Sequence, residues 1–193
     1  MLTTLPNFLT LSRIAVIPLL IGAFFLDKPT AHWVAAGLFA AASLTDFMDG
    51  YLARSWDQVT RLGQFLDPVA DKIMVAVALF MMVATEWMSG WLIMPALVIL
   101  VREILVSGLR EFLAEINVGL PVGQLAKWKT ALQMTAISLL LLGEAAPPAL
   151  GTQIVGAWGL WIAAILTLVT GYDYLRAGLS HMTEDSDEPG NKS

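Results

Sequence analysis

Six long hydrophobic stretches alternate with short polar connections along the chain. Each stretch has roughly 18 to 24 residues, the length at which an α-helix rising about 1.5 Å per residue crosses about 30 Å of hydrocarbon. The connections are rich in Gly, Pro, Asp and Ser, which favour turns. The pattern therefore predicts an all-α polytopic membrane protein with six transmembrane helices, at residues 7–26, 31–53, 65–86, 91–112, 126–143 and 153–176.

The composition supports this prediction. Of 193 residues, 57% are hydrophobic and 14% are charged, whereas a soluble domain typically has about 25% charged residues. The absence of cysteine excludes disulfides, thiolate catalysis and cysteine-ligated zinc. No basic surface of the kind that binds nucleic acid is indicated. We expect one membrane domain over residues 1–182 and a disordered acidic tail over residues 183–193.

Basic residues are distributed unevenly among the connections. Lys28 stands almost alone after the first predicted helix. The second and fourth connections and the end of the last helix carry most of the others, namely Arg54, Arg61, Arg110, Lys127, Lys129 and Arg176. Because basic residues are retained on the cytoplasmic side of membranes, both termini and these two connections are predicted to be cytoplasmic.

Four aspartates lie at the cytoplasmic ends of the second and third predicted helices. Asp46 and Asp49 are three residues apart, and Asp67 and Asp71 are four apart, so each pair shares one helical face. Because the connection between the two helices is short, we expect antiparallel neighbours whose aspartates converge at a polar cavity that opens to the cytoplasm.

Four converging carboxylates would repel one another unless they were protonated or neutralised. Lys72 and Arg54 are too few to balance them, so bound cations are expected. Oxygen ligands favour Mg²⁺, Mn²⁺ or Ca²⁺, and four acids with room for water and phosphate suit two cations. The alternative for a single residue such as Asp46 is a helix end wetted by interfacial water. Gly50 would let a ligand approach the backbone, and Arg54 offers a planar fork for phosphate.

These residues complete the pattern D-x2-D-G-x2-A-R-x8-G-x3-D-x3-D, as Asp46, Asp49, Gly50, Ala53, Arg54, Gly63, Asp67 and Asp71. The pattern resembles the signature of the CDP-alcohol phosphotransferases. The likeness extends to flanking strings, namely PNFLTLSRIAVIP (6–18), FLDPVADK (65–72), REILVSGLRE (102–111) and KWKT (127–130). Those strings are most similar to the bacterial members that use glycerol 3-phosphate as acceptor.

The resemblance implies an enzyme that binds two divalent cations, Mg²⁺ or Mn²⁺, at the pyrophosphate of CDP-diacylglycerol. Asp46, Asp49 and Asp67 would be the principal metal ligands. Asp71 would help to hold metal and would act as general base. The CDP part would contact Gly50, Ala53 and Arg54, and CMP would be the leaving group.

The acceptor side is expected on the fourth and fifth helices. An arginine inside a membrane helix normally has an anionic partner, and for Arg102 the candidates are Glu103, Glu111 or the aspartates. The resemblance instead implies that the phosphate of glycerol 3-phosphate is bound by Arg102, Arg110 and Lys127. The family usually has glycine where this chain has Ala126. Lys129 is expected to be an interfacial anchor.

Two other groups of residues have no predicted role as metal ligands. Arg13 is expected either to snorkel to the membrane surface or to belong to the family's opening motif. His32 and His181 lie at helix ends, away from the acids.

The expected reaction transfers the phosphatidyl group of CDP-diacylglycerol to glycerol 3-phosphate and gives phosphatidylglycerophosphate and CMP in phospholipid biosynthesis. The resemblance implies that the protein lies in the bacterial inner membrane, and it is compatible with a homodimer. Cardiolipin, phosphatidylserine and phosphatidylinositol-phosphate synthases share the aspartate pattern and are the alternatives. A cation-coupled transporter is the alternative from another class, because embedded acids and arginines also mark ion pathways.

Overall fold

The computed structural model describes residues 5–56, 61–115 and 124–184. All regular structure in these segments is helical. The long helices are α1 (Leu5–Ala23), α2 (Thr30–Trp56), α3 (Arg61–Ala84), α4 (Ile93–Glu115), α5 (Gln124–Leu142) and α6 (Thr152–Glu184). Short 3-10 turns precede α4 and join α5 to α6, namely η1 (Gly90–Leu92), η2 (Gly143–Ala145) and η3 (Pro148–Leu150). The prediction of an all-α fold is confirmed.

The six predicted helices correspond one to one with α1 to α6. Most ends agree within a few residues, but α6 continues to Glu184 instead of ending at residue 176. The helix therefore includes the first two positions of the predicted acidic tail, and the rest of that tail lies outside the described residues.

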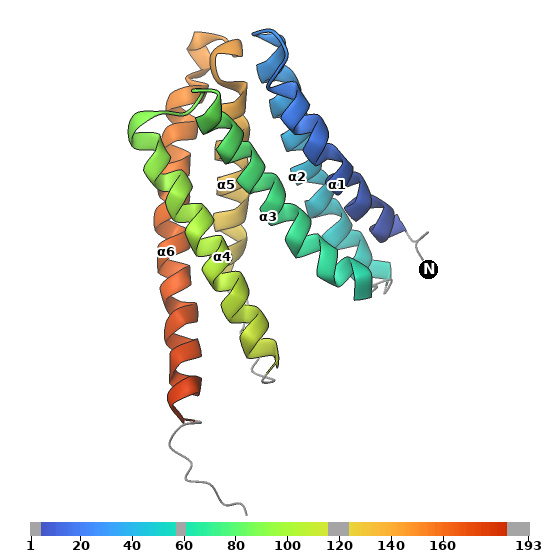
Figure 1. Cartoon of the computed structure of the whole chain (residues 1–193), viewed down its shortest axis with the longest axis vertical. Coiled ribbons are helices and arrows are strands. Elements are labelled where there is room, and N and C mark those ends of the chain that lie inside the picture. The colour runs from blue at the N-terminus through green and yellow to red at the C-terminus, as the bar shows by residue number, and fades with distance from the viewer. Residues whose placement is uncertain (1–4, 57–60, 116–123, 185–193) are drawn as a thin grey trace, which may run out of the picture.

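The helices run alternately up and down (Figure 1). The ends of α2, α4 and α6 lie at the same end of the bundle as the starts of α1, α3 and α5. The helix ends that flank the two connections predicted to be cytoplasmic therefore lie at one end of the bundle. Towards that end α1, α2 and α3 diverge from α4, α5 and α6 (Figure 1).

The first three helices pack differently from the simple hairpin expected for α2 and α3. Among the described residues, α1 packs extensively along both α2 and α3, whereas α2 and α3 touch each other much less. On the other side, α6 packs along α4 and α5, and α5 also contacts α2. Helix α1 therefore holds together the two helices that carry the aspartates.

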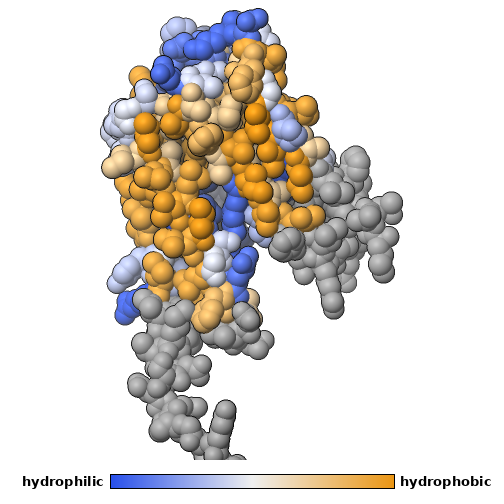
Figure 2. All heavy atoms as spheres, viewed as in Figure 1, coloured by the Kyte–Doolittle hydropathy of each residue, from blue (hydrophilic) through white to orange (hydrophobic). Residues whose placement is uncertain are grey.

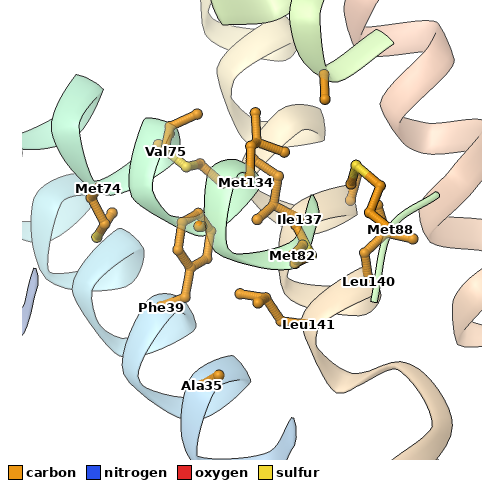
Figure 3. Packing of buried hydrophobic residues seen from close by; sticks show 14 of the residues in the cluster. Ala35, Phe39, Met74, Val75, Met82, Met88, Met134, Ile137, Leu140 and Leu141 are labelled. Atoms are coloured by element: carbon orange, nitrogen blue, oxygen red, sulfur yellow. The ribbon is translucent and has the colours of Figure 1, made fainter. Parts of the chain in front are cut away.

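Methionine and branched aliphatic side chains form the centre of the bundle, where α2, α3 and α5 meet (Figure 3). Phe39 of α2, Met74 and Met82 of α3, and Ile137 and Leu141 of α5 are fully buried. Unbranched methionines adapt to irregular gaps between helices. This core joins the two halves of the bundle.

The end opposite the aspartates is held together by His32. Its Nδ1 lies 2.9 Å from the backbone oxygen of Leu141, and its ring stacks on Trp87 with a centroid distance of 3.7 Å. Gly143 has a φ of 46°, and a Cβ there would lie 3.2 Å from the His32 ring. The contacts tie the start of α2 to the end of α5 and to the α3–α4 connection. His32 has a structural role here.

Large apolar side chains cover the outside of the bundle, as the orange surface in Figure 2 shows. Examples are Ile104 on α4, 72% exposed, and Ile154 on α6, 68% exposed. Exposed apolar surface of this extent is typical of contact with lipid. By length and composition, the segments Gly90–Ala114 and Pro148–Arg176 could each cross a membrane. The structure is consistent with a membrane protein, and six crossings stay a prediction.

Helices α5 and α6 are in close contact at two glycines of α6. A Cβ added at Gly156 would lie 2.9 Å from Cγ of Leu140 and 3.1 Å from the backbone oxygen of Ala136. At Gly159 it would lie 3.1 Å from Cβ of Ala136. Small residues let helix backbones come together in membranes, so these positions set the distance between α5 and α6.

We therefore expect Gly156→Ala to destabilise the protein by about 1–3 kcal/mol, because the added methyl group would force α6 away from α5. The measurement is the midpoint of thermal unfolding in detergent. The matched control is Gly37→Ala on α2, where a Cβ would meet nothing within 4 Å. An unfolding midpoint for Gly156→Ala equal to or above that of Gly37→Ala would contradict this packing.

Candidate active site

Arg13 of α1 is buried and forms an ion pair with Asp46 of α2, whose side chain is 36% exposed. The guanidinium NH1 lies 2.6 Å from Oδ1 of Asp46, and the Arg13 side chain is 1% exposed. A buried cation is tolerated only with a counter-charge. The expectation that Arg13 snorkels is therefore wrong, because its head group lies inside the protein beside the first motif aspartate.

Asp71 lies on α3 and faces the same region as Asp46. The charges that act on it are those of Asp46, Arg13, Glu103 and Lys72. Its Oδ1 is buried and has no hydrogen-bond partner among the described residues. The structure thus brings one aspartate from each predicted pair into one charged neighbourhood, with a carboxylate oxygen left for a ligand.

The side chains of the other motif residues lie outside the described ones. They are Asp49, Gly50, Ala53 and Arg54 in α2, and Gly63 and Asp67 in α3. Their backbone is helical, as the argument from shared helical faces requires. Among the side chains that are described, no group of three or more His, Asp or Glu lies close enough together to hold a metal ion. The four-aspartate ligand set stays a prediction.

The chemistry of the described acids nevertheless fits a hard divalent cation. Mg²⁺ and Mn²⁺ prefer carboxylate oxygens, and Asp46 and Asp71 offer these from two helices. A buried carboxylate oxygen without a partner costs free energy, and a bound cation would remove that cost at Asp71.

A second group of charges lies on α4 and α5, both of which contact α3. Lys72 of α3 donates to the hydroxyl of Ser107 on α4, and Lys129 of α5 donates to Oε1 of Glu103 on α4. Lys129 is only 4% exposed. Its expected role as an interfacial anchor is therefore wrong, since its ammonium is buried between helices. Figure 2 shows hydrophilic atoms between the two hydrophobic parts of the surface.

Arg102 uses three of its nitrogens on protein acceptors. Nε donates to the backbone oxygen of Thr167 at 3.0 Å, and NH2 donates to Oγ1 of Thr170 at 3.0 Å, both on α6. NH1 lies 3.4 Å from Oε1 of Glu103. Of the partners considered from the sequence, Glu103 is therefore in contact with Arg102, together with two α6 groups that the sequence did not indicate.

Arg110 and Lys127, the other predicted acceptor residues, are exposed. Arg110 is one of the charges that act on Arg102, which it follows on α4. Lys127 lies in the first turns of α5. The structure thus places two of the three predicted phosphate ligands on the surface and the third inside the bundle.

Sequence reasoning missed the contact of Glu103 with Lys129 and the contact of Ser107 with Lys72. The available signal is the spacing of Glu103 and Ser107 with Arg110, since these three polar residues follow the i, i+4, i+7 pattern of one helical face in a largely apolar helix. A polar stripe of this kind on a membrane helix indicates a face turned towards other protein groups.

The profile of the CDP-alcohol phosphatidyltransferase family matches residues 3–169. Three similar proteins are each named CDP-diacylglycerol–glycerol-3-phosphate 3-phosphatidyltransferase. The one from Rickettsia bellii is 49% identical over 90% of this chain and 94% of its own length. The one from Pseudomonas fluorescens is 45% identical over 94% and 93%, and the one from Cereibacter sphaeroides is 40% identical over 94% and 98%.

The matched region includes the complete aspartate motif, the Arg13–Asp46 ion pair and the charged residues of α4 and α5. The similarity to the relatives extends over nearly the whole chain on both sides. On this evidence the chain belongs to the CDP-alcohol phosphatidyltransferase family.

Proposed function

We propose that this protein transfers the phosphatidyl group of CDP-diacylglycerol to glycerol 3-phosphate and releases CMP. The observation that carries the proposal is the similarity of 40–49% identity, over at least 90% of the chain, to relatives named for this reaction. The geometry supports it, because acids that suit a metal-bound pyrophosphate lie on α2 and α3, and cations that suit an anionic acceptor lie on α4 and α5, which contact α3.

The proposed setting is the bacterial inner membrane, with six crossings and with both termini and the active site at the cytoplasm. Three features support it. The six helices alternate in direction, large apolar side chains face outward, and basic residues gather at the end that carries the aspartates. CDP-diacylglycerol would then reach the site from the lipid, and glycerol 3-phosphate would reach it from the cytoplasm.

Two divalent cations, Mg²⁺ or Mn²⁺, are the proposed cofactors, held by Asp46, Asp49, Asp67 and Asp71. Bound there, they would neutralise the pyrophosphate and polarise the phosphorus that is attacked. The buried Oδ1 of Asp71 and its proximity to Asp46 support this assignment. Arg13 already neutralises part of the charge on Asp46, so the site does not depend on metal alone for charge balance.

The residues of the chain have separate tasks in the proposed reaction. Gly50, Ala53 and Arg54 bind the CDP part. Asp71 accepts the proton of the acceptor hydroxyl while the hydroxyl oxygen attacks the phosphatidyl phosphorus. The new oxygen–phosphorus bond forms while the bond from that phosphorus to the CMP oxygen breaks. Little covalent help is needed from the protein, because such transfers depend mainly on positioning and charge neutralisation.

The acceptor phosphate is proposed to bind Arg110 and Lys127, with Arg102 completing the site. Glycerol 3-phosphate is a dianion that must lose water beside several carboxylates, so it needs concentrated positive charge at a distance from them. Arginine grips phosphate through several charge-assisted hydrogen bonds. Arg102 has five N–H groups, and the contacts with α6 and Glu103 use three of them.

The proposal is tested by release of CMP from CDP-diacylglycerol with a panel of acceptors. Purified protein in detergent should use glycerol 3-phosphate in preference to serine, inositol phosphate and phosphatidylglycerol. EDTA should abolish the activity, and added Mg²⁺ or Mn²⁺ should restore it. Preference for another acceptor would refute the acceptor assignment, activity in EDTA would refute the metal assignment, and no CMP release with any acceptor would favour a transporter.

Asp71→Asn should lower turnover by about 100-fold or more, because general bases typically contribute that much. Binding of a CDP-lipid analogue at fixed Mg²⁺, measured by isothermal titration, should change far less, since asparagine preserves the size of the side chain. The control is Thr85→Val just past the other end of α3, where the hydroxyl donates to the backbone oxygen of Met81. Near-normal turnover of Asp71→Asn would show that Asp71 is not the base.

Arg110→Ala should raise the KM for glycerol 3-phosphate by about 10- to 1000-fold, which corresponds to roughly 1.4–4 kcal/mol of lost charged contact. The KM for CDP-diacylglycerol should change much less. The control is Arg176→Ala, which removes an exposed arginine of α6 that has no proposed role. If Arg110→Ala raised both KM values alike, Arg110 would not be specific to the acceptor.

A further inference from the structure

Glu103 lies at the centre of a contact that joins three helices. Its Oε1 accepts from Lys129 on α5 and lies 3.4 Å from NH1 of Arg102, its neighbour on α4. Arg102 in turn donates to Thr167 and Thr170 on α6. One carboxylate oxygen of α4 therefore contacts α5 directly, through Lys129. It also contacts Arg102, the residue that joins α4 to α6. We call these residues, Arg102, Glu103, Lys129, Thr167 and Thr170, the Glu103 clamp.

The backbone of α6 is shaped to accept this contact. Gly171 lies where the Arg102 side chain passes, and a Cβ there would lie 3.2 Å from Cγ and 3.3 Å from Nε of Arg102. Any larger residue would therefore press on the nitrogen that donates to Thr167. The glycine is an observation independent of the charges, and it indicates that the position of Arg102 against α6 is specified.

The clamp is enclosed by protein. The side chain of Lys129 is 5% exposed, that of Arg102 is 11% exposed and that of Glu103 is 21% exposed. Two cations in such surroundings need an anion between them. Loss of the Glu103 charge would leave both without this partner, so we expect Lys129 and Arg102 to shift and the three helices to lose their fixed spacing.

We infer that Glu103 is a positioning residue for the acceptor site, acting through Lys129 and Arg102. The inference rests on the proposed function. Arg110 follows Glu103 by about two turns on α4, and Lys127 immediately precedes the turn that contains Lys129 on α5. The clamp therefore fixes the spacing between the helices that carry the two exposed cations, and two side chains grip one phosphate only if that spacing is held.

The clamp also lies next to the proposed base. Glu103 is among the charges that act on Asp71, and Asp71 is among those that act on Lys129. An acceptor held by Arg110 and Lys127 must present its hydroxyl to Asp71, so a change in the spacing of α4 and α5 would move that hydroxyl relative to the base. Disrupting the clamp should therefore weaken binding of the acceptor and leave binding of CDP-diacylglycerol unchanged.

The test is a cycle of Glu103→Gln, Lys129→Met and the double variant, with kinetics for both substrates. Each single variant should raise the KM for glycerol 3-phosphate by about 10-fold or more, while the KM for CDP-diacylglycerol stays within about 2-fold. The double variant should be no worse than either single one, because residues that act as a unit are not additive. Glu103→Asp should regain part of the loss, since it restores the charge.

Gly171→Ala tests the same clamp without changing any charge. It should also raise the KM for glycerol 3-phosphate, whereas Gly37→Ala, with open space around its added methyl group, should not. Assays are run below the unfolding temperature of each variant, as judged by circular dichroism. Gly171→Ala remains available if Glu103→Gln fails to fold.

Failure of the inference can be told from failure of the proposed function. If the wild-type protein does not release CMP with glycerol 3-phosphate, the proposed function is refuted and the inference falls with it. If the wild type turns over normally, three results would refute the inference alone. They are an unchanged acceptor KM in Glu103→Gln, an equal rise in both KM values, and a fall in the acceptor KM, which would mean that Glu103 merely masks two phosphate-binding cations.

Discussion

The cost of enclosing charge inside an apolar bundle governs the arrangement of this protein. A buried ion without a counter-ion is expensive, and removing one partner of a buried pair is strongly destabilising. The buried cations accordingly have acidic partners, Arg13 with Asp46 and Lys129 with Glu103. Each of these pairs joins two helices, so the requirement for charge balance also determines which helices lie together.

The two pairs divide the work of the proposed site. The first belongs to α1 and α2 and supports the aspartates that would bind metal and pyrophosphate. The second belongs to α4 and α5 and supports the cations that would bind the acceptor. Helix α5 contacts α2 through the core around Phe39 and Ile137, and this apolar contact relates one half of the site to the other.

Much of the fold could be predicted from the sequence, because both of its main signals are local. The lengths of the hydrophobic stretches predicted the six helices. The spacing of Asp46, Asp49, Asp67 and Asp71 indicated the family and the expected metal ligands. The end of α6 was less predictable, since the polar residues beyond residue 176 continue the helix without an apolar pattern to mark it.

The partners of buried charges could not be predicted, because they depend on how each helix is rotated in the bundle. Lys127 and Lys129 look alike in sequence, but two residues correspond to about 200° around a helix. One is therefore exposed and the other is buried against Glu103. The same limit applies to Arg13, whose burial follows from the packing of α1 along both α2 and α3.

The His32 contacts at the far end have a mechanical consequence for the aspartates. The two halves of the bundle are joined there and diverge towards the site (Figure 1), so each helix behaves as a lever with its pivot at the tied end. From His32 to Asp46 the helix rises about 21 Å, and a tilt of about 5° at the pivot would displace Asp46 by about 2 Å. Misplacement by about 1 Å can cost a catalytic site about 100-fold in rate. The fit of one imidazole between Trp87 and Leu141 thus limits the angular tolerance of the proposed chemistry at the other end of the bundle.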